Sequence, residues 1–482
     1  MIMPKSTGPF HIIGIGGIGM SAIADIMHTH GYTVQGSDQK DSANLRRLAA
    51  KGIPVFPYHD PGHLAGVRRV VISSAVKPGN PELDAARAMG LPVITRAEML
   101  AELMRMHRTI AVTGSHGKTT TTSMVSWILE QAGTDPTVIA GGIINGWGTN
   151  ARVGKGEWMV VEADESDGTF MKLPAQIGVV TNIDPEHLDY YDTLDCLHEA
   201  FEIFLAKIPF YGVAVVGIDH PVVREMMERI GRVENGRRMV AFGFSQDADV
   251  RAVNVSTRNG GMAFDVEFAA NAAGGERVLP GVHIKQPGHY NVLNALAAIA
   301  VAGEAGVPDD AIRAALASFG GVKRRFTLTG TWNGVSVYDD YAHHPAEIAS
   351  VLKAARQSSG GRVIAVAQPH RYSRLKSLFE EFSLCFGDAD TVLLLPVYSA
   401  GERANGVDHE TLADSVRGKG HPDVRTLASE ELLPPAIAAI ASPGDTVVCL
   451  GAGTITEWAN ALPGKLDDLA QAVAGGASAA AE

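Results

Sequence analysis

The chain has 482 residues, of which 46% are hydrophobic and 20% are charged, and its formal net charge is −12. This length exceeds one ordinary hydrophobic core, so about two to four globular domains are expected. The acidic balance argues against nucleic-acid binding, which needs a basic face, although one pocket of an acidic protein can be locally positive and bind a small anion.

The cysteines and the apolar runs indicate the cellular compartment of the protein. Cys196, Cys385 and Cys449 are odd in number and far apart, so neither a disulfide framework nor a zinc cluster is expected. No stretch of about 18 uncharged apolar residues predicts a membrane span. The segment from Met1 to Phe10 lacks the apolar run of a signal peptide. We therefore expect a cytoplasmic protein without membrane or nucleic-acid partners.

The first predicted elements are a strand at His11–Gly14, a helix at about Met20–His30 and a strand at Thr33–Gly36. Further short strands are expected at Val70–Ser73 and Val93–Ile94. This alternation predicts a doubly wound parallel sheet.

A glycine-rich turn joins the first strand to the first helix. It reads Gly14-Ile-Gly-Gly-Ile-Gly19, and Asp38 follows about 20 residues later. This pattern is a dinucleotide fingerprint, which leaves an NAD-dependent oxidoreductase open. A UDP-sugar also contains a pyrophosphate, which can bind at the N-terminus of the helix. A tight turn without any ligand is the third interpretation.

The strand and helix pattern restarts at Thr109–Thr113, with a long helix at about Lys118–Ala132, so we place a domain boundary near His107. A strand here leads into a glycine-rich loop and then into a helix. The loop departs from the common G-x-x-x-x-G-K-[ST] spacing, because Val112 stands where the first glycine would be.

This second loop has the residue types of a nucleotide site. Gly114 and Gly117 let backbone N–H groups approach phosphates, and Lys118 adds a fixed positive charge. Thr119 or Thr120 can offer a hydroxyl to Mg²⁺. The alternative is a helix start that is merely rich in threonine.

Carboxylates follow the next apolar strand. The segment Val160-Val-Glu-Ala-Asp-Glu-Ser-Asp167 presents four of them, and such hard oxygen donors near a phosphate loop suit Mg²⁺. The following strand, which begins at Gly178, ends near Asn182 and His187. A lone histidine is usually structural, but this one ends a strand in the same domain as the phosphate loop.

Further along, the residues from about Val250 to Val282 have a period of two, which predicts an antiparallel patch. Asn291 and Asn294 open an apolar helix, where asparagine is commonly only a cap. The basic cluster at Lys323, Arg324 and Arg325 is interpreted as the second domain junction.

The last part of the chain restarts the pattern once more. Strands are expected at Val335–Tyr338, Arg362–Ala367, Thr391–Leu395 and Thr446–Leu450. Two polar segments follow the first two of these strands: Asp339-Asp-Tyr-Ala-His-His-Pro345 and Gln368-Pro-His-Arg-Tyr-Ser-Arg374. Ligands bind at such strand ends in open α/β sheets, and arginine suits carboxylates and phosphates. The alternative is an ordinary surface loop.

Taken in order, these motifs resemble those of the Mur ligase family. The resemblance spans roughly Ile12 to Trp458, which is nearly the whole chain. It implies an α/β protein of three domains: a Rossmann-like UDP-substrate domain at 1–107, a central P-loop ATPase-like domain at 108–324, and a Rossmann-like amino-acid domain at 325–482.

Within the family, the chain looks most like the members that add alanine. The opening through Ser21, the segment from Phe201 to Gly212 and the Gln368 motif carry this likeness. Later members have a carbamylated lysine about fourteen residues after the motif histidine, and Phe201 stands there in this chain. The murein tripeptide recycling ligase of the same family is the alternative, and Ser166 to Pro174 fits it less well.

The resemblance implies roles for individual residues. The ATP site would comprise Gly114, Ser115, His116, Gly117, Lys118, Thr119, Thr120, Asn291, Asn294, Arg325 and Asp340. The UDP substrate would contact Gly14, Gly16, Gly17, Gly19, Met20, Ser21, Ser37, Asp38, Ser73 and Ser74. The amino acid would contact Tyr341, His343, Arg371 and Arg374, and Mg²⁺ would be held by Thr119, Glu162 and His187. Catalysis would rest on Lys118, Glu162, His187, His343 and Arg371.

The implied reaction uses ATP and Mg²⁺ to join UDP-N-acetylmuramate to L-alanine through an acyl phosphate, in peptidoglycan precursor synthesis. Closure of the third domain would bring Arg325 and Asp340 onto ATP. Two departures are Ser115, where threonine is usual, and Tyr290, where histidine is usual. A nucleotide-gated switch without ligation is a further alternative, and we expect a monomer or weak homodimer.

Overall fold

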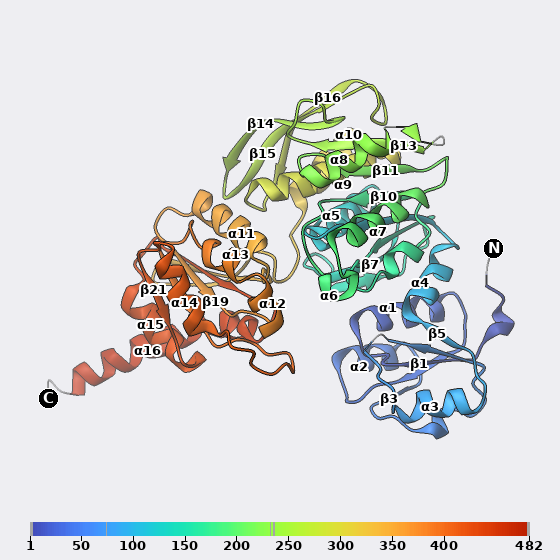
Figure 1. The fold of residues 1–482 in the computed structure, drawn as a ribbon, viewed down its shortest axis with the longest axis horizontal. Coiled ribbons are helices and arrows are strands. Elements are labelled where there is room, and N and C mark those ends of the chain that lie inside the picture. The colour runs from blue at the N-terminus through green and yellow to red at the C-terminus, as the bar shows by residue number, and fades with distance from the viewer. Residues whose placement is uncertain (1–2, 74, 232, 235–236, 480–482) are drawn as a thin grey trace. The chain divides into compact units, whose positions relative to one another are not determined.

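The computed structural model describes residues 3–73, 75–231, 233–234 and 237–479. Over these residues the chain forms sheets of five, eleven and six strands (Figure 1). The chain divides into two compact units. The first comprises Met1–Val253, Asp265–Val282 and Leu293–Phe319, and the second comprises Asn254–Phe264, His283–Val292 and Gly320–Glu482.

The first sheet is parallel throughout and has the order β3-β2-β1-β4-β5. Its strands are β1 (Phe10–Ile13), β2 (Val34–Ser37), β3 (Val55–Phe56), β4 (Arg69–Ile72) and β5 (Val93–Thr95). Its helices are α1 (Ile18–Thr29), α2 (Ala43–Ala50), α3 (Pro81–Ala88) and α4 (Arg96–Met104). The strand order reverses between β1 and β4, and such a switch point is where open α/β sheets bind ligands. This arrangement confirms the predicted doubly wound sheet.

The second sheet has the order β16-β15-β14-β13-β11-β10-β6-β9-β7-β8, with β12 beside β13. Its first strands are β6 (Arg108–Thr113), β7 (Thr137–Ile144), β8 (Thr149–Arg152), β9 (Trp158–Glu162), β10 (Ile177–Val180) and β11 (Val213–Gly217). The others are β12 (Val233–Glu234), β13 (Arg237–Gly243), β14 (Val250–Arg258), β15 (Gly261–Phe268) and β16 (Arg277–Ile284). Strand β6 lies between β10 and β9 and is parallel to both. Its carboxyl end therefore meets theirs at one edge of the sheet.

Six helices accompany this sheet within the described residues. They are α5 (Lys118–Gln131), α6 (Leu188–Tyr191), α7 (Leu194–Ala206), α8 (Pro221–Ile230), α9 (His289–Glu304) and α10 (Asp309–Ser318). Among the described residues, no helix combines the length and the apolar character that crossing a bilayer would require.

Strands β14 and β15 form a tight hairpin. The connecting residues, Asn259 and Gly260, have φ angles of 51° and 76°, which are typical of a two-residue hairpin turn. A two-residue connection joins only antiparallel strands. The period of two in this stretch thus corresponds to an antiparallel pair.

The third sheet has the order β17-β18-β22-β19-β20-β21. Its strands are β17 (Thr327–Trp332), β18 (Val335–Asp340), β19 (Val363–Ala367), β20 (Thr391–Leu394), β21 (Val424–Thr426) and β22 (Thr446–Leu450). Its helices are α11 (Pro345–Ser358), α12 (Tyr372–Ser377), α13 (Phe379–Leu384), α14 (His409–Gly418), α15 (Leu433–Ile440) and α16 (Ile455–Ala479). Only β17 runs antiparallel to its neighbour among the described pairings of this sheet.

Candidate active site

The loop between β6 and α5 has two positions that accept only glycine. Gly114 has a φ of 126°, and a Cβ there would lie 2.1 Å from Thr181 Oγ1. Gly117, which precedes α5, has a φ of 82°, and a Cβ there would lie 2.4 Å from Asn294 Oδ1. Side chains are thus excluded on both sides of the loop. The backbone N–H groups of a helix N-terminus are the natural ligands for phosphate.

Lys118 begins α5 and is held inside this loop. Its Nζ donates to Gly114 O at 2.7 Å, to Ser115 O at 3.0 Å and to Glu165 Oε1 at 2.8 Å. Burial lowers the pKa of Lys118, but the carboxylates of Glu165, Asp164 and Glu186 together outweigh this effect, and the pKa lies above its ordinary value. Burial raises the pKa of Glu165 to about 7, against the opposing charge of Lys118. The loop therefore keeps its cation beside a buried carboxyl group.

The predicted metal ligands fall into two adjoining groups. Thr119 Oγ1 donates to Glu162 Oε1 at 2.9 Å, so these two predicted ligands lie together. His187 instead lies with Glu165 and Glu186, and one ligand atom from each of the three lies within 4.8 Å of the others. His187 Nε2 is 3.6 Å from Glu165 Oε1, so Glu165 links this group to Lys118.

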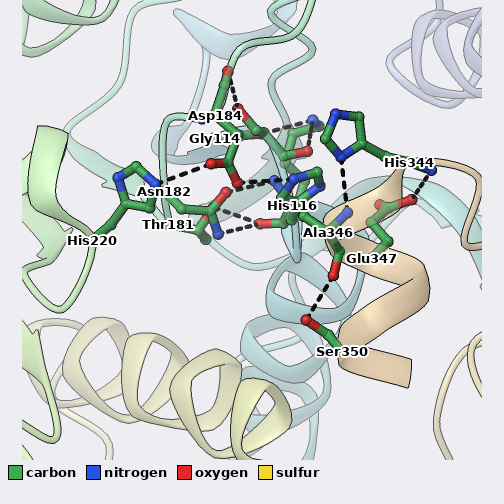
Figure 2. A network of polar contacts seen from close by, with 12 residues as sticks. Gly114, His116, Thr181, Asn182, Asp184, His220, His344, Ala346, Glu347 and Ser350 are labelled. Atoms are coloured by element: carbon green, nitrogen blue, oxygen red, sulfur yellow. Dashed lines mark hydrogen bonds and ion pairs between the residues drawn. The ribbon is translucent and has the colours of Figure 1, made fainter. Parts of the chain in front are cut away.

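The other predicted residues of the loop are fixed by the chain after β10, which Figure 2 shows. His116 N donates to Asn182 Oδ1 at 2.7 Å, and its carbonyl accepts from Thr181 Oγ1 at 2.7 Å. Ser115 Oγ accepts from Asp184 N at 2.8 Å. Thr120 is buried in the first turn of α5. The loop is thus formed by contacts within the protein itself.

Asn291 and Asn294 differ in their contacts although both lie on α9. Asn294 Oδ1 accepts from Thr121 Oγ1 at 3.1 Å, which ties α9 to α5 beside Gly117. Asn291 Nδ2 donates to Pro287 O at 2.7 Å and belongs to the second unit. Burial raises the pKa of Tyr290, so its hydroxyl stays protonated.

The glycine-rich turn after β1 is closed by a carboxylate. Gly16 N donates to Asp38 Oδ2 at 2.8 Å, and a Cβ on Gly16 would lie 2.5 Å from Leu45 Cδ1. Gly14 has a φ of 80°, and Gly17 caps α1. A Cβ on Gly19 would approach Arg96 Nη1 at 3.2 Å. Asp38 thus braces the turn that it was expected to flank.

The remaining predicted contacts of this turn are mostly buried. Met20 and Ser21 are both buried in α1. Ser73 Oγ accepts from Ala75 N at 3.3 Å, and Ser74 lies outside the described residues. Ser37 is buried, and its hydroxyl donates to Glu82 Oε2. The Ser37 hydroxyl is therefore engaged within the protein.

Glu82 is the centre of a histidine cluster that the sequence alone does not indicate. Its carboxylate lies 3.3 Å from His11 Nε2, 3.0 Å from His59 Nδ1 and 2.7 Å from His63 Nδ1. Burial alone would raise the pKa of Glu82, but the hydrogen bonds from His11, Ser37 and His63 outweigh it and lower the pKa to about 2. The four residues are far apart in the sequence of the N-terminal domain, so no local motif indicates that they form a cluster.

Asp339 and Asp340 correct a sequence-based boundary, because they are the last residues of β18 and not part of the loop that follows. Asp340 accepts from Phe326 N and Ala342 N, each at 2.7 Å. Burial raises the pKa of Asp340 to about 6, against the charge of Arg325. The Arg325 guanidinium lies 5.2 Å from the centre of the Tyr341 ring.

Two of the predicted amino-acid residues, His343 and Arg374, lie beside His370. Arg374 Nη1 donates to His370 Nδ1 at 3.3 Å, and the His343 and His370 rings are 5.8 Å apart. Burial lowers the pKa of His370 to about 4; the charges of His343, Arg374 and Arg371 act in the same direction, and that of Glu402 opposes them. Arg371 precedes α12 with a φ of 66°, which an L-residue adopts only under constraint.

His343 itself is oriented by nearby backbone. Its Nδ1 donates to Tyr341 O at 3.0 Å and lies 3.4 Å from Glu347 Oε2. The next residue, His344, caps α11 by accepting from Ala346 N at 3.3 Å, and Figure 2 labels both partners. Of the two adjacent histidines, His343 thus belongs to the candidate site, and His344 caps a helix.

Sequence models of a known family match the chain in successive segments. The description "Mur ligase family, catalytic domain" matches residues 9–108, and "Mur ligase middle domain" matches residues 112–302. The description "Mur ligase, glutamate ligase domain" matches residues 324–453.

Curated relatives are similar over nearly the full length. A UDP-N-acetylmuramate–L-alanine ligase of Allorhizobium ampelinum is 57% identical over 470 residues, which cover 97% of this chain and 99% of the relative. The enzyme of that name from Methylobacterium radiotolerans is 56% identical over 467 residues, covering 97% and 99%.

Solved structures show the same architecture. UDP-N-acetylmuramate-alanine ligase from Thermotoga maritima has a TM-score of 0.77 and 28% identity, covering 96% of this chain and 99% of that one. A murein peptide ligase from Psychrobacter arcticus has a TM-score of 0.66 and 24% identity, covering 95% and 98%. At that identity the second likeness shows the fold alone.

Proposed function

The chain belongs to the Mur ligase family, and from this premise we propose that it is an ATP-dependent ligase joining the lactyl carboxylate of UDP-N-acetylmuramate to L-alanine. The observation that carries the proposal is the glycine-rich loop with Lys118 at the start of α5. It lies in a chain that is 57% identical to a UDP-N-acetylmuramate–L-alanine ligase. The reaction is a step in building peptidoglycan precursors.

The reaction has two steps in this proposal. The carboxylate attacks the γ-phosphorus of ATP, which forms an acyl phosphate and releases ADP. The amine of alanine then attacks the acyl carbon, phosphate leaves with the C–O electron pair, and the amine loses a proton. Phosphoryl transfer depends mainly on positioning and charge neutralisation. Lys118 and the loop amides supply both, since they are fixed by contacts within the protein.

The donors at this loop fit a magnesium ion. Thr119 and Glu162 provide a hydroxyl and a carboxylate, and His187 lies in the adjoining group with Glu165 and Glu186. Oxygen donors of this kind suit Mg²⁺, which would neutralise the charge of the transferred phosphoryl group. Glu165 thereby enters the proposed site as a residue that contacts Lys118 and adjoins the metal donors.

The other two substrates are assigned to the remaining predicted residues. The turn from Gly14 to Gly19 is proposed to bind the UDP pyrophosphate, and the group around His343, Arg371 and Arg374 the alanine. The domain boundaries after residues 107 and 324, a cytoplasmic location and a monomeric or weakly dimeric state remain parts of the proposal.

The deciding experiment measures ADP release by the purified protein. ATP and UDP-N-acetylmuramate are supplied with L-alanine, glycine, L-serine or the murein tripeptide, one at a time. We expect release that requires both the UDP substrate and L-alanine. Release with the tripeptide but not with alanine would instead identify a recycling ligase. A titration with NADH, expected to show no binding, separates the proposal from an oxidoreductase.

A further inference from the structure

Asp184 joins two histidines, one of which lies in the phosphate loop. Asp184 Oδ2 is 3.0 Å from His116 Nε2, and Asp184 Oδ1 is 3.2 Å from His220 Nε2, so the carboxylate bridges the two rings (Figure 2). His116 belongs to the loop before α5, and His220 precedes α8. The three residues come from separate segments, which is why the sequence does not group them.

The backbone of the loop does not depend on this carboxylate. His116 N is bound by Asn182 Oδ1 at 2.7 Å, and His116 O accepts from Thr181 Oγ1 at 2.7 Å and Asn182 Nδ2 at 3.1 Å. Ser115 N donates to Asn182 O at 3.0 Å. Since these contacts already hold the main chain, what the Asp184 carboxylate adds is a restraint on the His116 ring.

The chemistry of the bridge defines that restraint. An ionised carboxylate only accepts hydrogen bonds, so His220 must present a hydrogen on Nε2 to Asp184 Oδ1, whereas His116 Nε2 contacts Asp184 Oδ2 as an ion pair at 3.0 Å. The hydrogen bonds from His116 and His220 outweigh the effect of burial and keep the pKa of Asp184 well below its ordinary value. His220 also holds the second oxygen, so the carboxylate is fixed at both ends. The contact with Asp184 Oδ2 therefore restrains the orientation of the His116 ring.

We propose that Asp184 is a positioning residue for phosphoryl transfer, which acts by fixing the His116 imidazole within the phosphate loop. This inference rests on the proposed ligase function, because it takes the ligand of the loop to be the triphosphate of ATP. A ring held in place makes its contact with a phosphate without first losing rotational freedom. The effect of Asp184 must therefore pass through His116.

The test compares steady-state kinetics of Asp184→Ala, Asp184→Asn and His116→Gln with the unmodified protein. We expect kcat for ADP release at saturating ATP to fall about tenfold or more in each variant, as expected for the loss of one oriented contact to a charged group. The KM values for the UDP substrate and alanine should stay unchanged. The matched control is Asp414→Asn, because Asp414 is a 79% exposed aspartate of α14 that pairs with Arg417 and belongs to the second unit.

A double-mutant cycle separates positioning from general support of the fold. In the His116→Gln background, Asp184→Asn should cause no further loss of kcat. Full additivity of the two losses, or unchanged kcat in Asp184→Ala, would overturn the inference. If Asp184→Ala fails to fold, the isosteric Asp184→Asn variant carries the cycle.

The same set of variants distinguishes failure of the inference from failure of the proposed function. Unmodified protein that releases no ADP with any of the four amine substrates would contradict the ligase proposal. The cycle is then measured as ATP affinity by titration calorimetry, with non-additive losses expected and additive ones overturning the role of Asp184.

Discussion

Lys118 is the residue on which nucleotide turnover should depend most. Its ammonium group is held by two loop carbonyls and Glu165, so it lies where phosphate oxygens would gather. We expect Lys118→Ala to lower the rate of ATP turnover by on the order of 10² or more, because one charge partner of the transition state is lost. Turnover assays at saturating ATP measure this, with Lys207→Ala, an exposed lysine of α7's C-terminal end, as the control. An unchanged kcat would contradict the assignment.

The Glu82 carboxylate should make the free energy of unfolding depend on pH in the acid range. Its pKa is about 2 in the folded protein and 4.5 ordinarily, so its stabilisation is complete above pH 4.5 and is lost as the pH falls toward 2. The difference corresponds to about 3 kcal/mol. We expect Glu82→Gln to lower the urea midpoint clearly at pH 7 and much less at pH 3.

The control for this comparison is Glu102→Gln, since Glu102 and its partner Arg105 are about half exposed and such pairs contribute little. An equal loss at both pH values in Glu82→Gln would mean that packing, and not the ionised carboxylate, is what the substitution removes.

Single residues divide into those that local sequence reveals and those that it does not. Lys118, Thr119 and Glu162 stand in motifs, so strand order alone suffices to bring them together. In the bridge, Asp184 contacts His220, 36 positions away, and His116, 68 positions away. In the other cluster, Glu82 contacts His63, 19 positions away, and His11, 71 positions away. Isolated histidines carry no periodic signal, and only the folded chain pairs them.

At the scale of elements, the turn between β1 and α1 is specific for a residue without a side chain. A Cβ on Gly16 would lie 2.5 Å from Leu45 Cδ1 and 2.8 Å from Asp38 Oδ2. We expect Gly16→Val to displace Asp38 and raise the KM for the UDP substrate, with little change in the KM for ATP. Initial-rate measurements with each substrate varied would show this. A rise confined to the KM for ATP would mean that the two glycine-rich turns are assigned the wrong way round.

Helix α7 bears on how the metal site is completed. Phe201 is fully buried in it, and its ring is 5.1 Å from that of Phe170. No carbamate can form on a phenylalanine, so we expect activity that is independent of bicarbonate and an intact mass without a labile CO₂ adduct. A CO₂-stripped sample that regains activity when bicarbonate is added would contradict this.

The strands of the parallel sheets are the elements that sequence predicts best. A strand buried on both faces is a short apolar run, and the expected strand at Thr446–Leu450 has the observed bounds. The antiparallel edge strand β17 lacks such a run, since most of its residues are only partly buried. Strand β18 extends through Asp339 and Asp340, where Thr456 donates to Asp339 Oδ2 and backbone N–H groups donate to Asp340. No local pattern indicates these partners.

At the scale of the whole molecule, the two half-reactions draw on different parts of the chain. The phosphate loop belongs to the first unit, whereas Arg374 and His370 belong to the second. We expect Arg374→Ala to raise the KM for alanine by the factor that corresponds to roughly 2–4 kcal/mol of lost charge-assisted binding free energy. Acyl-phosphate formation should survive, and hydroxylamine in place of alanine should trap it as a hydroxamate.

The control for this prediction is Arg425→Ala, because Arg425 is a half-exposed arginine of the same unit that pairs with Asp423. An unchanged KM for alanine in Arg374→Ala would reduce Arg374 to a surface residue. Loss of the hydroxamate would move Arg374 to the ATP side of the reaction.

The pairing of Lys118 with Glu165 means that the phosphate loop carries its own counter-ion. A phosphate that binds Lys118 competes with that carboxylate, which is 1% exposed. A competitive inhibitor that offers only negative charge bears this desolvation cost, whereas one that also places a donor group against Glu165 relieves it. The affinity of such compounds should therefore depend on the hydrogen bonds that they donate to the Glu165 carboxylate as much as on their contacts with Lys118.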